Sequence, residues 1–313
     1  MTKQASGVSV RADHSDELHA GIRPQLAELI ALRRAAMQGR QARRGHYAVS
    51  GRAASTMRGR GMEYAESREY VAGDDARHID WKLTARTDAT HTKTFQTERE
   101  RVTLLVADTA AALYFGTRVR FKSVQAARAG AVATWSALRD GDRLAALRGS
   151  RQQSLVPPAG GTRGALRVLD ALTRWYAEPQ ADDAGLQFAL ERAARVLHPG
   201  ARAVVLADPA SASAVPAAVW SALSMHVEVQ LLLLVDPLEI SPPQCVLPVA
   251  TSAGRMRFDL GSEAVRSAWH EALIGPVEAL VRQLPGRRIR VSTLCSDDAS
   301  DAWLGTAGLR SPA

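Results

Sequence analysis

Short aliphatic runs that each end in an aspartate constrain the fold more than any other feature of this sequence. The runs and their aspartates are Val102–Ala107 with Asp108, residues 203–207 with Asp208, and residues 227–235 with Asp236. Unbroken apolar runs that alternate with helical segments are typical of parallel strands covered on both faces. We therefore predict an α/β fold with a doubly wound, mostly parallel sheet. Its carboxyl edge, where ligands bind in such folds, should be polar and acidic.

Amphipathic segments supply the helices that such a sheet needs. Apolar residues recur at helical spacing in residues 15–38, 121–139, 163–176, 184–197, 216–224 and 262–284. The last segment can bend at Gly275-Pro276. Further strands are expected at residues 143–147, 154–156 and 288–294, and residues 246–250 and 255–260 should form a hairpin. We divide the chain into a tail and helix (1–45), an irregular segment packed on the sheet (46–100) and the α/β domain (101–305).

The positive charge of the chain is concentrated at its N-terminal end. The formal net charge is +8, and residues 1–60 contribute +7 of it through eleven Lys/Arg and four Asp/Glu. A basic arm of this kind can bind nucleic acid. Residues 33–60 contain only Tyr47 as an aromatic for base stacking, however, and docking on an acidic protein explains the arm equally well.

The cysteines and the hydrophobic runs exclude other classes of protein. Cys245 and Cys295 have no CxxC or zinc-site spacing, and two cysteines cannot form a disulfide scaffold, so we expect a reducing cytoplasm. The longest aliphatic run, Leu231 to Val235, is too short to span a bilayer, and we expect no membrane span. The N-terminus has no apolar core of a secretory signal.

The densest group of charged and aromatic residues lies before the first predicted strand. Gly73, Asp74 and Asp75 are typical of a turn, and Asp75 is a good N-cap for a short helix. One interpretation, which we favour over catalysis, is an ion-pair network that holds an irregular segment against the sheet. Its members would be Arg68, Asp75, Arg77, Asp80 and Arg86.

This group also resembles a known family signature. The residues that carry the resemblance are Arg60, Gly61, Glu63, Arg68, Glu69, Tyr70, Gly73, Asp74, Asp75, Arg77, Ile79, Asp80, Trp81, Lys82, Thr84, Ala85 and Arg86. They closely resemble the signature of the bacterial family called domain of unknown function 58, over roughly residues 32–305. The resemblance implies a von Willebrand factor A-like domain and a MoxR-type AAA+ ATPase as the usual companion.

From this resemblance we expect the segment to be a binding platform. Its residues are Arg60, Glu63, Arg68, Tyr70, Gly73, Asp74, Asp75, Arg77, Asp80, Trp81 and Arg86.

The resemblance also implies a metal site, from which this sequence departs. The family usually has Asp-x-Ser-x-Ser after its first strand, and these side chains ligate a divalent cation. Here the run from Asp108 has alanine at both serine positions, Ala110 and Ala112, and alanine offers no oxygen to a hard cation. Asp208 fits a further ligand position, and the position of a threonine ligand stays open between Thr162 and Asp183. We predict a degenerate site (Asp108, Thr162, Asp208) that at most holds Mg²⁺ weakly, with no other cofactor.

The functional hypothesis is a non-enzymatic interaction module. It would work with a MoxR-type AAA+ ATPase in the assembly or maturation of protein complexes, without catalytic residues of its own. The sequence has no phosphate-binding loop, so ATP hydrolysis would belong to the partner. The alternative is a nucleic-acid-binding protein that uses the basic arm. A hydrolase at the Asp108/Asp208 edge is the weakest hypothesis, because the sequence offers no nucleophile–base pair.

Overall fold

The computed structural model describes residues 21–38, 62–97, 101–153, 155–251 and 254–304. The chain divides into two compact units. Residues Val49–Glu100 form the smaller unit, and Met1–Ala48 together with Arg101–Ala313 form the larger one.

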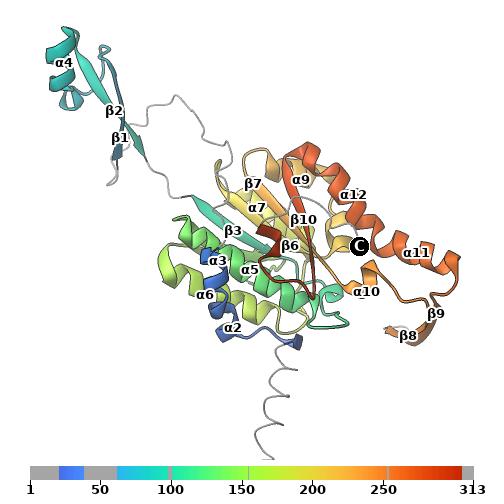
Figure 1. The fold of residues 1–313 in the computed structure, drawn as a ribbon. Coiled ribbons are helices and arrows are strands. Elements are labelled where there is room, and N and C mark those ends of the chain that lie inside the picture. Colours follow the sequence, from blue (N-terminus) through green and yellow to red (C-terminus); the bar gives the residue numbers. More distant parts are fainter. Residues whose placement is uncertain (1–20, 39–61, 98–100, 154, 252–253, 305–313) are drawn as a thin grey trace, which may run out of the picture. The chain divides into compact units, whose positions relative to one another are not determined.

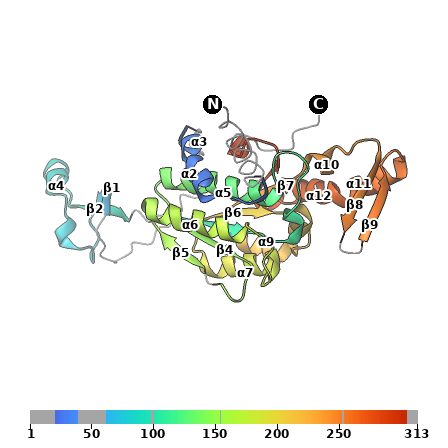
Figure 2. The same ribbon diagram turned by 90° about the horizontal axis from the view of Figure 1, so that it is seen from below.

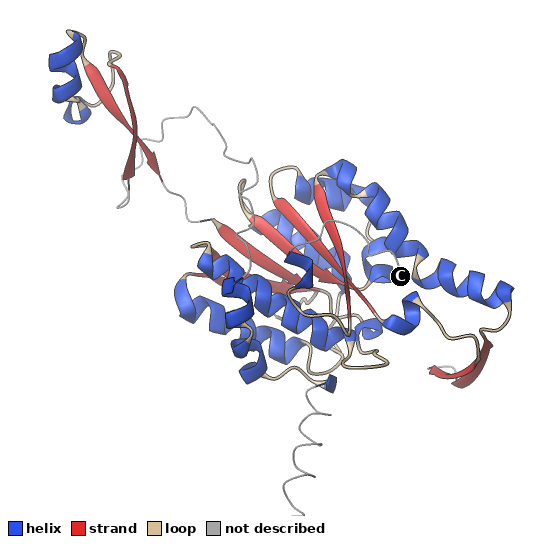
Figure 3. Ribbon diagram, viewed as in Figure 1, coloured by secondary structure: helices blue, strands red, loops and turns tan. Residues whose placement is uncertain are grey.

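A six-stranded sheet lies at the centre of the larger unit (Figures 1 and 3). The strands, in spatial order, are β10 (Ile289–Cys295), β7 (Glu228–Val235), β6 (Arg202–Ala207), β3 (Val102–Ala107), β4 (Arg143–Arg148) and β5 (Val156–Ala159). All neighbours are parallel except β4 and β5, which pair antiparallel. The mostly parallel α/β sheet predicted from the aliphatic runs is confirmed.

Helices cover both faces of this sheet, as Figure 2 shows. One face carries α5 (Lys122–Arg139) and α6 (Gly161–Trp175), with α2 (Leu26–Ala31) and α3 (Arg33–Gln38) against them. The other face carries α7 (Gly185–Val196), α8 (Pro209–Ser213), α9 (Ala217–Ser224) and α12 (Gly275–Gln283). Successive residues of β3, such as Leu104 and Leu105, enter opposite cores. Burial on both faces explains why these strands are largely apolar, without the alternation of a half-exposed strand.

The described N-terminal helices pack against α5. Leu29 and Ala36 are fully buried. The indole nitrogen of Trp135 donates to the carbonyl of Leu29 at 3.0 Å, and Arg139 donates to the carbonyl of Ala36 at 2.8 Å. The predicted helical segment is therefore two short helices over its described part, and both belong to the unit that contains the sheet.

Proline residues affect two of the predicted elements. The expected strand at residues 154–156 is β5 (Val156–Ala159), which contains Pro157 and Pro158. Its position at the edge of the sheet tolerates residues that cannot donate to the ladder. The helical segment at residues 262–284, for which a bend at Gly275-Pro276 was predicted, divides at that point into α11 (Glu263–Leu273) and α12, since Pro276 cannot continue the backbone hydrogen bonds of the first helix.

The remaining elements of the larger unit lie mainly after β7. They are α10 (Pro237–Ile240), the hairpin of β8 (Val246–Thr251) and β9 (Gly254–Asp259), and the short 3₁₀ turns η2 (Ala111–Leu113), η3 (Pro285–Arg287) and η4 (Ala302–Leu304). The predicted hairpin is thus confirmed. In the described part of the chain, no helix is long and apolar enough to cross a membrane.

The strand order creates a switch point between β3 and β6. The chain proceeds from β3 to β4 on one side, whereas β6 and then β7 lie on the other side. Crossovers that depart in opposite directions leave a crevice at the carboxyl ends of the two central strands. Asp108 and Asp208 directly follow these strands, so the topology brings both to that crevice.

The described part of the smaller unit, residues 62–97, contains regular structure. β1 (Met62–Glu69) pairs antiparallel with β2 (His91–Thr97), and η1 (Ala76–His78) and α4 (Trp81–Thr87) lie between them in sequence. We call these residues the motif unit. Their interpretation as irregular was wrong over this range, because the strands are rich in polar residues and give no apolar run. That the segment packs on the sheet stays a prediction.

Candidate functional site

Buried charged side chains gather at the carboxyl edge of the sheet. They are Asp108 after β3, Asp208 after β6, Asp236 after β7, Lys122 at the start of α5, and Glu239 in α10. We call these five residues the edge cluster. Hydrogen bonds join them in one continuous chain, from Asp108 through Asp208 and Lys122 to Glu239 and Asp236.

Lys122 is the cation of the edge cluster. Its Nζ lies 2.8 Å from Oδ2 of Asp208 and 2.6 Å from Oε1 of Glu239, and its side chain is 2% exposed. Burial disfavours the ammonium form, but the two carboxylates outweigh this effect and raise the pKa of Lys122. A cation in the first turn of a helix is opposed by the helix dipole. Asp208 and Glu239 are therefore the groups that hold the charge in this place.

Asp108 links the ends of the two central strands. Its Oδ1 accepts from the backbone N–H of Ala110 at 3.0 Å, and its Oδ2 accepts from the backbone N–H of Asp208 at 3.0 Å. Burial raises the pKa of Asp108 to about 6, and the nearby charge of Asp208 adds to this rise. Asp208 in turn caps α8 by accepting from the backbone N–H of Ala210 at 2.9 Å. Both aspartates thus act as strand-end caps.

Asp236 holds the neighbouring loops together. It is fully buried, and it accepts from the backbone N–H and Oγ1 of Thr117 at 3.0 and 2.5 Å, from Oγ of Ser296 at 2.7 Å, and from the backbone N–H of Leu238 at 3.0 Å. Burial alone would raise the pKa of Asp236, but these hydrogen bonds lower it. Glu239 Oε2 accepts from the backbone N–H of Asp236 at 2.8 Å, which completes a capping box for α10.

The predicted metal ligands are only partly brought together. Asp108 and Asp208 are neighbours, but Thr162 begins α6 beyond the far end of β5. Because β5 is antiparallel to β4, that end lies at the opposite edge of the sheet, and Thr162 is exposed. The alternative, Asp183, pairs with Ser150 beyond the carboxyl end of β4 and accepts from the backbone N–H of Gly185 at 3.0 Å.

With Lys122 in place, the residues of the edge do not fit a divalent metal. Within the described ranges, no group of three or more His, Cys, Asp or Glu side chains could hold a metal ion. The ammonium of Lys122 lies where two carboxylates converge, so a positive charge is already in contact with them.

Short-range hydrogen bonds shape the motif unit. Arg68 pairs with Oδ1 of Asp74 at 2.7 Å, and Oδ2 of Asp74 accepts from the backbone N–H of Val71 at 3.0 Å. Asp80 caps α4 by accepting from the backbone N–H of Leu83 at 3.2 Å, and it accepts from Oγ of Ser67 at 2.9 Å. The pKa of Asp74 is lowered chiefly by the Val71 bond, and that of Asp80 chiefly by the Leu83 bond.

The expected ion-pair network is largely wrong. Asp75 accepts from the backbone N–H of Arg77 at 3.0 Å, and Asp80 is a helix cap. Arg77 and Arg86 are exposed, and neither forms an ion pair within the residues that the structure describes. Only Arg68 of the predicted cations has a carboxylate partner there, and that partner is Asp74. The segment is held by caps and turns rather than by paired charges.

The motif unit exposes large apolar side chains. Trp81 is 70% exposed, Val71 is 59% exposed, and Tyr70 is also exposed. Gly73, at the turn between them, has φ +109° and needs the conformational freedom of glycine. Of the other predicted platform residues, Arg60 lies outside the described residues and Glu63 lies in β1.

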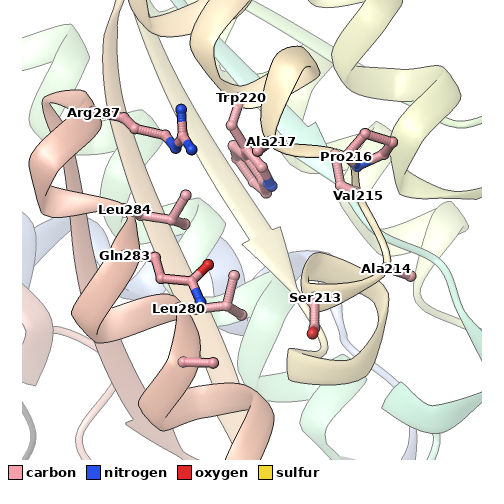
Figure 4. Close-up of a pocket in the computed structure, with 11 residues that line it drawn as sticks. Ser213, Ala214, Val215, Pro216, Ala217, Trp220, Leu280, Gln283, Leu284 and Arg287 are labelled. Atoms are coloured by element: carbon pink, nitrogen blue, oxygen red, sulfur yellow. The ribbon is translucent and has the colours of Figure 1, made fainter.

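A pocket on the face of the sheet that carries α8, α9 and α12 contains none of the predicted site residues. It has a volume of about 340 Å³ and lies between α8, α9 and α12. Figure 4 shows the indole of Trp220 facing Leu280 and Leu284 across it, with Gln283 and Arg287 nearby. The indole nitrogen of Trp220 is buried and has no hydrogen-bond partner among the described residues. The lining offers no nucleophile–base pair, and this pocket is not the candidate site.

Lys122 and Glu239 were not among the site residues predicted from the sequence. Glu239 had a recognisable signal, because Asp236-Pro237-Leu238-Glu239 has the spacing of a capping box. Lys122 had none, since one lysine at the start of an amphipathic helix is usually exposed.

Comparison with known proteins extends over both units. A family model described as "Protein of unknown function DUF58" matches residues 66–274, which include most of the motif unit and the whole edge cluster. Uncharacterized proteins of Mycobacterium bovis and of two Mycobacterium tuberculosis strains are 33% identical over 151 residues, or 48% of this chain and 48% of each relative. The matched region thus spans about half the length of these curated relatives. Because the family model covers more than half of the sequence, the chain belongs to the DUF58 family, whose function is unknown.

Proposed function

We propose that this chain is a non-enzymatic interaction module that serves as an adaptor for a MoxR-type AAA+ ATPase. The observation that carries the proposal is the exposure of Trp81 on a structured helix of the motif unit. Tryptophan is enriched among the few residues that dominate protein–protein binding energy. A large aromatic side chain in water, on a unit that also exposes Tyr70 and Val71, therefore suits a partner surface better than a folding role.

The short-range bonds of the motif unit support this proposal. The caps and turns made by Asp74 and Asp80 shape the surface before a partner arrives, and preorganisation reduces the entropy lost on binding. Arg77, Lys82 and Arg86 are exposed on the same unit. They can form the polar rim that surrounds the apolar centre of a typical interface.

The class of partner rests on the resemblance of the motif to its family, whose members usually accompany a MoxR-type ATPase. The work of the pair would be the assembly or maturation of other proteins. ATP hydrolysis would belong to the partner, because this sequence has no phosphate-binding loop.

The test is a binding titration of the full chain with a purified MoxR-type ATPase from the same organism. Trp81→Ala should weaken binding by about tenfold or more, the loss expected for an interface hot spot. Met225→Ala is the matched control, because Met225 is an exposed apolar residue of the larger unit. Both variants should keep the circular dichroism spectrum of the parent chain.

Equal affinities of the parent chain and Trp81→Ala would contradict the proposal. So would tight binding of duplex DNA with no ATPase binding, which would favour the basic arm as the functional element. Such binding would weaken steeply with salt, by a log–log slope of about −0.9 for each phosphate neutralised.

A further inference from the structure

The edge cluster has more carboxyl groups than cations in contact with them. Asp108, Asp208, Asp236 and Glu239 are all buried, and the ammonium of Lys122 is the charge that contacts two of them directly. Buried carboxylates without a counter-charge are strongly disfavoured, so a cation in contact with them stabilises an edge of this kind.

Lys122 meets that need from a different part of the fold. It comes from the first residue of α5, whereas Asp208 follows β6 and Glu239 lies in α10, so the three side chains converge from three separate elements. Its Nζ is within 2.8 Å of one carboxylate oxygen on each partner. The ammonium therefore occupies the point where two carboxylates could otherwise share a metal ion.

We propose that Lys122 is a resident cation that takes the place of a divalent metal at this edge. The edge is then independent of metal and insensitive to chelators in the parent chain. The same geometry makes a divalent site latent. When the lysine side chain is removed, Asp208 and Glu239 remain, and Mg²⁺ in proteins is commonly held by one or two carboxylates while it keeps several waters. This inference does not depend on the proposed adaptor function.

The experiment compares thermal midpoints of the full chain and two variants with and without about 10 mM MgCl₂ or MnCl₂. Lys122→Ala should lower the midpoint and leave space, and Mn²⁺ should raise its midpoint by about 2–5 °C. Lys122→Met is the matched control, because it also removes the charge but fills the space with an apolar chain. Its midpoint should fall and should not respond to metal. The parent chain should not respond either.

Electron paramagnetic resonance of Mn²⁺ provides a direct count of bound ions. The parent chain should leave Mn²⁺ free in solution, whereas Lys122→Ala should bind one ion. The double variant Lys122→Ala/Asp208→Asn should bind none. If Lys122→Ala does not fold alone, refolding with and without Mn²⁺ replaces the thermal comparison, and recovery only with Mn²⁺ supports the proposal.

Specific outcomes would overturn it. One is a parent chain that binds Mn²⁺ through Asp208, because the site would then already be metallic. Another is a Lys122→Ala variant with no metal response in melting, resonance and refolding, because Lys122 would then be only a structural ion-pair partner.

Discussion

Replacing Asp236 with alanine tests whether the edge cluster holds the loops of the larger unit together. The carboxylate is fully buried and accepts four hydrogen bonds, from Thr117, Leu238 and Ser296. Ser296 is itself fully buried, so its hydroxyl would lose its acceptor without gaining water. A buried polar group left unpaired costs about 1–3 kcal/mol. Loss of the α10 cap adds about 1 kcal/mol.

The expected loss of unfolding free energy in Asp236→Ala is therefore about 3 kcal/mol, since exposed Thr117 can bond to water instead. With a denaturant slope of about 3 kcal/mol per molar urea, the urea midpoint should fall by about 1 M. Tryptophan fluorescence is a suitable readout, because buried Trp135 and Trp220 both lie in the larger unit.

Asp170→Ala is the matched control for this measurement. Asp170 pairs with Arg174 one helical turn later, at 3.1 Å, and both side chains are more than half exposed. Removal of such a pair should cost less than about 0.5 kcal/mol. If Asp236→Ala shifts the urea midpoint no more than Asp170→Ala does, the four hydrogen bonds do not hold the edge, and the reasoning about the cluster fails.

Other predictions concern pH and the motif unit. The pKa of Asp108 is raised to about 6 in the folded state, above its value in an unfolded chain. Between about pH 4 and pH 6 the folded state therefore binds more protons than the unfolded state. The contribution of Asp108 to the free energy of unfolding thus falls as the pH rises through this range. The free energy of unfolding should fall by about 3 kcal/mol over this range. The urea midpoint of Asp108→Asn, measured from about pH 4.5 to 7, should lack this fall, and an equal pH dependence in the variant and the parent chain would refute the prediction. Asp80→Ala should lower the thermal midpoint of the motif unit, because Leu83 N–H and Ser67 Oγ lose their acceptor. Arg86→Ala should leave that midpoint unchanged, because the side chain of Arg86 is exposed. If circular dichroism shows the same midpoint for Asp80→Ala and Arg86→Ala, the Asp80 cap does not stabilise the motif unit.

The fold was predictable because its strands are buried on both faces. A run such as Val102–Ala107 is largely apolar for that reason, and its signal depends only on local sequence. The motif unit gave no such signal, since β1 and β2 carry many polar residues. The sequence of each strand alone does not show that the two strands pair, although Asp75 and Gly73 were correctly predicted as a cap and a turn residue.

The edge cluster was predictable only in part, for a related reason. Asp108, Asp208 and Asp236 follow recognisable strands, and parallel strands bring their carboxyl ends to one edge. The partner of Asp208 is Lys122, 86 positions earlier, and no local pattern connects them. Thr162 does not lie near Asp108 and Asp208, because β5 runs antiparallel to β4 and α6 therefore begins at the opposite edge of the sheet. Strand direction is set by pairing and cannot be read from the residues of β5 alone.

The two candidate sites differ in what they have left to offer a ligand. At the sheet edge, the carboxylates and the ammonium of the edge cluster already form hydrogen bonds with one another and with backbone N–H groups. A ligand there would have to break bonds between buried charges, which costs several kcal/mol. In the motif unit the polar groups shape the backbone, while Trp81 is 70% exposed, so a partner can contact it without breaking a bond between buried charges. We therefore expect substitutions at Trp81 to affect binding without affecting stability, and substitutions at Lys122 or Asp236 to do the reverse.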